Sequence, residues 1–280
     1  MKCEHLMAEA YPFNHHPCWT DNRQEAWERI HLPIAPRCNV KCAFCDHNAT
    51  SSCHVPRPGY SSRLMKPREA FERTMALLSD RPNLRIVAVA GPGEPFANNE
   101  TLQTMSMIRS ERSDLKFCLS TNGVLLADKI DDIVEIGLET VTVSVSTVRP
   151  KTAAVIYEWA EIDGTVMRGI SMGERIIQRQ LKGISEAAEA GIHVKCNTIM
   201  IPSLNATEMK EISQHLSEAG ASIQNIVPLV PYAGMSHLRR PTRHEIALAR
   251  QEASEYCRQF THCRQCRSDV VGIPGNDTVL

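Results

Sequence analysis

The sequence lacks several features that mark large classes of protein. Its 31 basic and 32 acidic residues give a formal net charge of −1, whereas a nucleic-acid-binding protein usually carries a basic excess. It contains no run of about 18 apolar residues, so we expect no membrane-spanning helix. The start, MKCEHLMAEAYPFNHHPC, lacks the apolar stretch of a secretory signal peptide. Low-complexity tracts and internal repeats are also missing. These absences predict a cytoplasmic protein that binds neither nucleic acid nor membrane.

Cysteine, by contrast, is abundant. Eleven cysteines occur among 280 residues, and their odd number excludes complete pairing in disulfides. In a chain without an export signal, clustered cysteines indicate metal binding or catalysis rather than a disulfide framework. The hydrophobic content of 42% is ample for a large core. The sequence therefore predicts an intracellular globular protein whose chemistry depends on thiols.

Short apolar runs alternate with segments of helical period. The runs are nearly continuous in apolar residues, as strands of a parallel sheet are when both faces are buried. The predicted strands cover 30–36, 84–91, 116–123, 140–146, 193–202 and 222–231. The predicted helices cover 66–80, 98–111, 127–137, 171–191, 205–220 and 242–260. This order predicts an α/β fold, a partial (β/α)6 TIM-like barrel, because a complete eight-unit barrel needs about 250 residues. A doubly wound open sheet is the alternative, and both folds gather chemistry at the carboxyl ends of the strands.

The densest cysteine cluster follows the first predicted strand. Cys38, Cys42 and Cys45 stand in CNVKCAFC with C-x3-C-x2-C spacing. Closed zinc sites and ordinary [4Fe–4S] clusters take four protein ligands, so three thiolates leave one metal corner open. A zinc site completed by His47 is the alternative. With Phe44 before the last cysteine, the motif resembles that of the radical S-adenosylmethionine (SAM) superfamily. That resemblance implies a [4Fe–4S] cluster held by the three cysteines, with SAM bound to its fourth iron.

Two further motifs end the second and third predicted strands. GPGEP occupies the place of the SAM amino-group motif in that superfamily; its glycines let the backbone approach a ligand, and its glutamate is an acceptor for an ammonium group. STNG offers a hydroxyl and an amide for a ribose or a carboxylate. The plainer interpretations are an ordinary βα turn and an Asn-Gly turn. The candidate SAM-binding residues are Gly91, Gly93, Glu94, Pro95, Ser120 and Asn122.

Residues 30–260 form the predicted barrel, between an N-terminal extension, 1–29, and a C-terminal tail, 261–280. Both ends carry cysteine and histidine, and we expect them to fold over the barrel mouth. In the tail, Cys263 and Cys266 have metal-ligand spacing beside His262, with a small separate zinc site as the alternative. The cysteines without partners at such spacing are interpreted as ordinary thiols: Cys3, Cys196 and Cys257.

The whole chain carries a more specific set of motifs. HPC, RPG, AGPGEP, CLSTNG, IYEW, QLKG, MIP and HCRQCRSDVVG occur in this order over nearly its full length. Together they resemble the NifB family, the radical SAM enzymes of nitrogenase cofactor assembly, in the short methanogen-like form without a C-terminal carrier domain. The resemblance implies two further [4Fe–4S] clusters beside the SAM cluster. The implied ligands are His16, Cys18, Cys53, Cys118, Cys263 and Cys266, with His15 as the alternative to His16. Which ligand serves which cluster stays open.

The same resemblance implies a two-stage reaction. One SAM donates a methyl group to a cluster sulfide, and a second SAM yields a 5′-deoxyadenosyl radical that takes hydrogen from that methyl. The carbon becomes the central carbide as two clusters fuse into the iron–sulfur core precursor, NifB-co. The implied partners are an iron–sulfur cluster donor protein, an electron donor such as ferredoxin or flavodoxin, and an acceptor or carrier protein for the product.

One departure from the family leaves other functions open. Val55 and Pro56 stand before Arg57-Pro58-Gly59, where the family usually has Glu-Ser, so an acidic residue that would move protons is missing. This leaves room for a paralogue with altered or lost activity. The alternative functions are a radical SAM maturase that oxidises a peptide with auxiliary clusters, and a non-catalytic iron–sulfur or zinc carrier.

Overall fold

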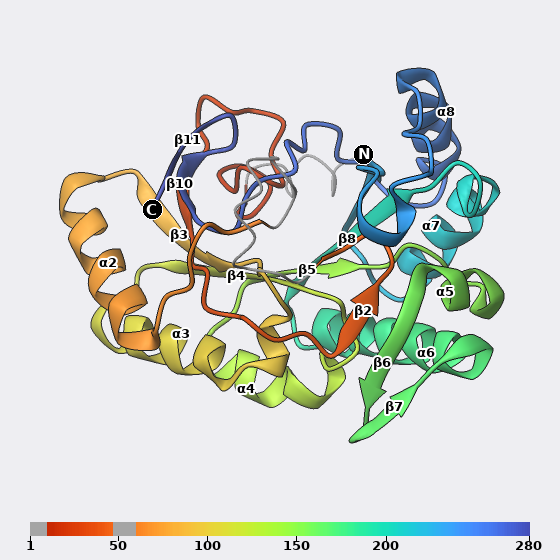
Figure 1. Cartoon of the computed structure of the whole chain (residues 1–280). Helices are drawn as coiled ribbons and strands as arrows, with labels where there is room; N and C mark the ends of the chain where they lie inside the picture. The colour runs from red at the N-terminus through yellow and green to blue at the C-terminus, as the bar shows by residue number, and fades with distance from the viewer. Residues whose placement is uncertain (1–9, 47–59) are drawn as a thin grey trace.

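The fold is built on an eight-stranded sheet in which six strands run parallel (Figure 1). The computed structural model describes residues 10–46 and 60–280. In chain order and in sheet order alike, the parallel strands are β1 (Glu28–His31), β3 (Leu84–Val89), β4 (Lys116–Thr121), β5 (Thr140–Ser144), β8 (His193–Met200) and β9 (Ile223–Pro228). In a doubly wound sheet, the order in which strands are added reverses part-way along the chain. Here each parallel strand is added on the same side of the one before it. The predicted partial barrel is therefore confirmed, and the doubly wound alternative is excluded.

The helices cover the outer face of this sheet (Figure 1). They are α2 (Pro67–Asp80), α3 (Asn99–Glu111), α4 (Ile130–Glu135), α5 (Pro150–Ile156), α6 (Gly169–Glu189), α7 (Met209–Glu218) and α8 (Arg243–Ala253). Short 3-10 turns are η1 (Pro95–Ala97), η2 (Ala127–Lys129), η3 (Ala206–Glu208) and η4 (Ala233–Met235). The capping box of Thr242 and Glu245 starts α8. No helix in the described ranges combines the length and apolarity that crossing a membrane requires.

The last helix is shorter than predicted. It ends at Ala253, although the sequence pattern predicts a helix as far as residue 260. The N–H of Gln224 donates to the carbonyl of Arg258 at 2.8 Å, and the N–H of Phe260 donates to the carbonyl of Gln224 at 2.7 Å. The chain leaves the helix because its backbone pairs beside β9 instead. Cys257, predicted in this helix, lies beyond its end.

Five strands lie outside the predicted pattern. β2 (Val40–Cys42), β6 (Tyr157–Ile162) and β7 (Thr165–Met167) form a separate three-stranded sheet. β10 (Val270–Ile273) and β11 (Asn276–Val279) form a hairpin, and β10 pairs antiparallel with β1. The end of the chain therefore completes one edge of the main sheet.

Side chains along each parallel strand point alternately to the core beneath the helices and to the inner face of the sheet. Leu119 and Val194 are fully buried in the core between sheet and helices. Their neighbours Cys118, Ser120 and Lys195 point to the opposite face, because successive side chains of a strand alternate. Residues 10–27 and 261–269 lie over this inner face (Figure 1). The candidate site is built there.

Candidate functional site

The three cysteines of CNVKCAFC lie in a tight segment after β1. Cys42 ends β2 and stands opposite Tyr157 of β6 in the ladder. The N–H of Cys45 donates to the carbonyl of Cys42 at 3.0 Å, and Lys41 Nζ donates to the carbonyl of Cys45 at 2.7 Å. These local bonds close the segment into a turn. The β2–β6 pairing then fixes the turn at the carboxyl end of the parallel strands.

The negative charge that each thiol would carry makes it harder for the other thiols of the trio to lose a proton. Burial, together with the charges of Glu94 and Cys45, raises the pKa of Cys38 to about 12. Burial and the charges of Cys45 and Cys38 raise the pKa of Cys42 as well. Thiols in this situation stay protonated until a cation binds them, and iron is a metal that thiolates prefer. The trio therefore fits an iron cluster.

Single-ion sites find no support in the described ranges. Within residues 10–46 and 60–280, no three His, Cys, Asp or Glu side chains are close enough to hold one metal ion. An iron–sulfur cluster spreads its ligands more widely than one ion does. His47, the proposed fourth zinc ligand, lies outside the described residues.

The GPGEP turn packs against the backbone that leads to Cys38. The N–H of Gly93 donates to the carbonyl of Ala35 at 2.6 Å, and the N–H of Glu94 donates to the carbonyl of Arg37 at 2.8 Å. A Cβ on Gly93 would lie only 2.3 Å from the carbonyl oxygen of Arg37. Only glycine fits this contact. The motif, which begins at Gly91 and ends at Pro95, therefore packs the turn after β3 against the segment after β1.

The carboxylate of Glu94 binds protein groups on both oxygens. Oε1 accepts hydrogen bonds from Thr121 Oγ1 at 2.6 Å and from the N–H of Phe96 at 3.2 Å. Oε2 accepts one from the N–H of Asn122 at 2.6 Å. Burial raises the pKa of Glu94 to about 7, although these three donors lower it. Glu94 therefore joins the GPGEP turn to the STNG turn.

This buried carboxyl predicts a pH dependence of stability. Between pH 4.5 and about 7 the native metal-free chain keeps a proton on Glu94 that the unfolded chain has released. The free energy of unfolding of the wild type should therefore fall by up to about 3 kcal/mol, relative to Glu94→Gln, as the pH rises through this range. Urea unfolding at several pH values measures it. The exposed Glu174→Gln is the control and should keep the wild-type slope. Parallel curves for wild type and E94Q would contradict the raised pKa.

The STNG turn places an amide beside the cysteine segment. Asn122 Nδ2 donates to Asn39 Oδ1 at 2.8 Å and lies 3.9 Å from Cys38 Sγ. Gly123 has φ +82°, and a Cβ there would lie 2.6 Å from Val143 Cγ1. Ser120 faces the inner side of β4. The turn thus brings Asn122 next to the thiol trio and leaves Ser120 facing the cavity described next.

A cavity of about 340 Å³ opens on the inner face of the sheet. It is lined by residues of the predicted SAM site and by predicted ligands of the auxiliary clusters. From the SAM group these are Cys45 and Ser120. From the auxiliary-cluster group they are His16, Cys18, Cys118, Cys263 and Cys266. The structure therefore brings together thiols that lie up to 248 positions apart in the chain. Cys53, Val55, Pro56 and the Arg57-Pro58-Gly59 motif lie outside the described residues.

Histidines border this cavity as well. His16 Nδ1 accepts the N–H of Cys18 at 3.1 Å, and its Nε2 has no hydrogen-bond partner among the described residues. His15 does not line the cavity; it stacks on Trp27 with ring centroids 4.5 Å apart. His31, which no sequence motif marked as a candidate, also lines the cavity. Its position at the end of β1, where parallel strands gather functional side chains, could have marked it as a candidate.

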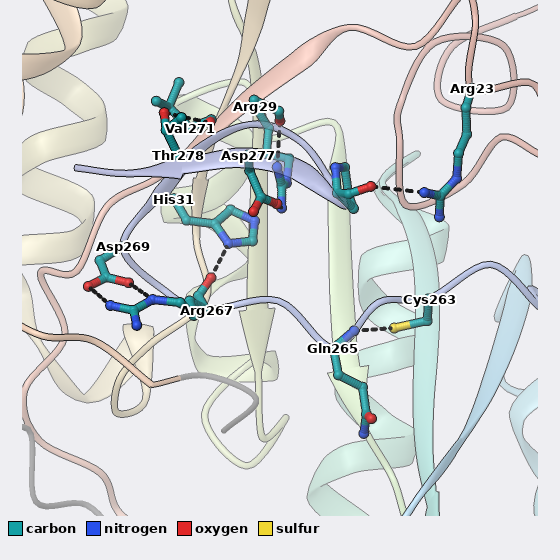
Figure 2. A network of polar contacts seen from close by, with 12 residues as sticks. Arg23, Arg29, His31, Cys263, Gln265, Arg267, Asp269, Val271, Asp277 and Thr278 are labelled. Atoms are coloured by element: carbon teal, nitrogen blue, oxygen red, sulfur yellow. Dashed lines mark hydrogen bonds and ion pairs between the residues drawn. The ribbon is translucent and has the colours of Figure 1, made fainter. Parts of the chain in front are cut away.

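The ring of His31 has a defined tautomer. Its Nδ1 lies 2.9 Å from the carbonyl oxygen of Arg267, which only accepts hydrogen bonds, so Nδ1 carries the proton (Figure 2). Nε2 keeps its lone pair, the arrangement common in metal-binding histidines. Burial and the charge of Arg29 lower the pKa of His31 to about 3. Burial and the charges of Lys195 and Arg29 likewise lower the pKa of His16. Both rings are therefore neutral near pH 7.

Polar contacts hold the tail around Cys263 and at Arg267 and Asp269 (Figure 2). The N–H of Gln265, which has φ +52°, lies 3.4 Å from Cys263 Sγ. The carboxylate of Asp269 accepts Arg267 Nε and Nη2 at 2.8 and 2.7 Å. It also accepts the N–H and the hydroxyl of Ser62, both at 2.7 Å. Burial raises the pKa of Asp269, but these hydrogen bonds together lower it below its ordinary value.

Asp269→Asn should weaken the attachment of the tail. The amide removes the ion pair with Arg267 and turns an N–H₂ toward groups that donate, so we expect a loss of about 3 kcal/mol in the free energy of unfolding. Faster amide hydrogen exchange at residues 60–62 and 266–270 should accompany it. Asp114→Asn, which removes an exposed pair with Arg112, is the control and should cost less than about 1 kcal/mol. Equal losses in the two variants would contradict the role of Asp269.

Comparison with known proteins places the chain in a family. The model of the Radical SAM superfamily matches residues 32–216. The FeMo cofactor biosynthesis protein NifB of Methanocaldococcus infernus is 36% identical over 258 residues, which cover 92% of this chain and 85% of that protein. The chain belongs to the NifB family. NifB of Klebsiella pneumoniae is 38% identical over 94% of this chain, which spans 57% of that longer protein.

Solved structures share the fold of this NifB family member. A radical SAM methyltransferase from Sphaerobacter thermophilus superposes with a TM-score of 0.54 at 17% identity, over 83% of this chain and 64% of that one. Methylornithine synthase (PylB) gives a TM-score of 0.54 at 12% identity, over 90% of this chain and 73% of that one. Membership of the superfamily implies one [4Fe–4S] cluster and SAM. The thiol trio, the close approach at Gly93 and the amide of Asn122 fit that pair.

Proposed function

We propose that this chain acts in FeMo cofactor biosynthesis by fusing two [4Fe–4S] clusters and inserting a SAM-derived carbon into the product. The cavity carries the proposal. Four cysteines and two histidines line it, and Cys45 and Ser120 of the SAM group border the same space. A radical SAM enzyme that only modified a small organic molecule would not need further thiols there.

The chain's own residues divide into two groups in this scheme. Cys38, Cys42 and Cys45 hold the SAM-site cluster, which when bound supplies the electron that cleaves SAM. The GPGEP and STNG turns hold the nucleotide beside it, with Gly91, Gly93, Glu94, Pro95, Ser120 and Asn122 as the proposed contacts. On β4, Ser120 follows Cys118 by two residues, a spacing of about 7 Å along a strand. A substrate cluster bound at Cys118 would therefore lie next to a nucleotide bound at Ser120.

The two substrate clusters are assigned to the remaining side chains that line the cavity. Cys18, Cys118, Cys263 and Cys266 are the proposed thiolate ligands, together with Cys53 from outside the described residues. His16 and His31 are the proposed nitrogen ligands. Their lowered pKa values keep both rings neutral, and a neutral ring leaves iron more easily than a thiolate does. Such ligands suit a product that has to leave.

Each histidine can be tested separately. His16→Ala and His31→Ala should each be compared with His15→Ala, which alters a ring outside the cavity. We expect the yield of fused core to fall in a variant that loses a ligand, with a changed electron paramagnetic resonance (EPR) spectrum of the substrate clusters. A variant with wild-type yield and spectrum would remove that histidine from the scheme.

Metal and product analysis test the function as a whole. Anaerobically reconstituted protein should hold about twelve iron atoms per chain if three four-iron clusters are present. Reduced protein with SAM should release 5′-deoxyadenosine and S-adenosylhomocysteine together. Deoxyadenosine without S-adenosylhomocysteine would instead support a peptide-oxidising maturase. Zinc without iron, and no SAM cleavage, would support a non-catalytic carrier.

The scheme also implies where the chain works and with what. We infer a cytoplasmic enzyme, with residues 30–260 as the catalytic barrel and with ligand-carrying segments at 1–29 and 261–280. It requires an iron–sulfur cluster donor, a reductant protein such as ferredoxin or flavodoxin, and an acceptor for the cluster product. The need for an acceptor is tested by mixing the loaded chain with the acceptor protein and measuring how much iron the acceptor gains.

A further inference from the structure

Lys195 is a buried cation in the wall of the cavity. It lies on β8 between Val194 and Cys196, which are fully buried in the core, so its side chain points to the inner face. Only 3% of Lys195 is exposed. Its Nζ donates to the carbonyl of Cys18 at 2.8 Å and lies 4.5 Å from the ring centroid of Phe260. The ammonium group is therefore held at the cavity against the backbone of Cys18, one of the four cysteines assigned to the substrate clusters.

No carboxylate of the described residues forms an ion pair with Lys195. The other buried cation nearby, Arg29, pairs with Asp277 at 2.9 Å. Among the ion pairs of residues 10–46 and 60–280, none involves Lys195, and its partners are a carbonyl and an aromatic ring. Burying an ammonium without an anion is unfavourable, because the charge loses its hydration and gains no counter-charge. A cation retained in such a place indicates an occupant that brings the negative charge.

The thiols around the cavity are the source of that charge when they bind iron. Lys195 bonds the backbone of Cys18, and its charge acts on Cys118 on the neighbouring side of the cavity. A [4Fe–4S] cluster with thiolate ligands is an anion, and it becomes more negative when it is reduced. A fixed ammonium beside it favours both binding and the reduced state.

We propose that Lys195 is an electrostatic anchor for the substrate iron–sulfur clusters, which retains them in the cavity and raises their reduction potential. This inference rests on the proposed function, because it takes the cavity to hold those clusters. Lys195 lies on a different strand from the SAM-binding turns, and its hydrogen bond goes to the segment of Cys18. Its removal therefore acts on the substrate clusters and leaves the SAM-site cluster in place.

Lys195→Met tests the anchor, because methionine keeps an unbranched side chain only one atom shorter and removes the charge. Lys195→Arg keeps the charge, and Lys182→Met removes an exposed lysine on α6 as a matched control. The full-length chain is reconstituted anaerobically and passed over a desalting column. Iron per chain is then measured, and the clusters are titrated with dithionite and followed by EPR, with and without SAM.

We expect K195M to lose substrate-cluster iron several-fold faster than the wild type and to shift the midpoint potential of the remaining substrate clusters to more negative values. The EPR response of the SAM-site cluster to SAM should be unchanged, which also shows that the variant folds. K195R and K182M should behave as the wild type. Wild-type iron retention and potential in K195M would overturn the inference, as would a K195R that behaves like K195M. Wild type that holds only about four iron atoms per chain would overturn the proposed function too.

Discussion

Cys42→Ala is expected to reduce SAM cleavage to the background rate, a loss on the order of a thousandfold or more. Cys42 ends β2, and its thiol is one of three whose charges act on one another. With two thiolates left, the SAM-site cluster loses a corner ligand that no other described thiol of the site replaces. The measurement is the release of 5′-deoxyadenosine by reduced, reconstituted protein, with iron per chain measured alongside.

Cys257→Ala is the matched control for this result. Cys257 is 5% exposed and lies beyond the end of α8, where its sulfur is 3.9 Å from the carbonyl oxygen of Ala221. It does not line the cavity, so C257A should keep SAM cleavage and lose only about 1 kcal/mol of stability. Substantial deoxyadenosine from C42A, at the C257A level, would show that the trio does not hold the cluster.

Gly93→Ala is expected to remove the response of the reduced cluster to SAM. The added Cβ would lie 2.3 Å from the carbonyl oxygen of Arg37 and 2.8 Å from that of Ala35. Relief of these contacts requires the GPGEP turn to move away from the segment that leads to Cys38, which separates the two halves of the SAM site. We also expect a loss of about 3 kcal/mol in the free energy of unfolding, as for other overpacked sites.

Gly164→Ala separates backbone strain from this steric clash. Gly164 has φ +73° but no atom within 4 Å of an added Cβ. G164A should therefore lose about 1 kcal/mol of stability and keep the EPR change on addition of SAM. A G93A protein with a wild-type EPR response would show that the turn does not shape the SAM site.

The sequence predicted the main sheet because its signals are local. Five of the six parallel strands fall within their predicted apolar runs, and each of the six is followed by a segment of helical period. β1 (Glu28–His31) begins two residues before its predicted run, 30–36, and shares only residues 30 and 31 with it. Strands β2 and β7 of the smaller sheet escaped this reasoning, since they have only three residues each. α8 was predicted too long because backbone pairing of Arg258 and Phe260 with Gln224 competes with the helix. A helical pattern carries no information about that distant partner.

The sequence by itself determined the six-unit order of strands and the thiol trio, and it carried the motifs that resemble the NifB family. These depend on residues a few positions apart, whose spacing is visible in the chain. Only the tertiary structure decided that His16 rather than His15 faces the cavity, that His31 belongs there, and that Lys195 adds a charge. Those decisions depend on contacts such as His31 with Arg267, 236 positions apart, and Lys195 with Cys18, 177 positions apart. No local pattern encodes them, because they exist only after the sheet has brought both ends of the chain to one face.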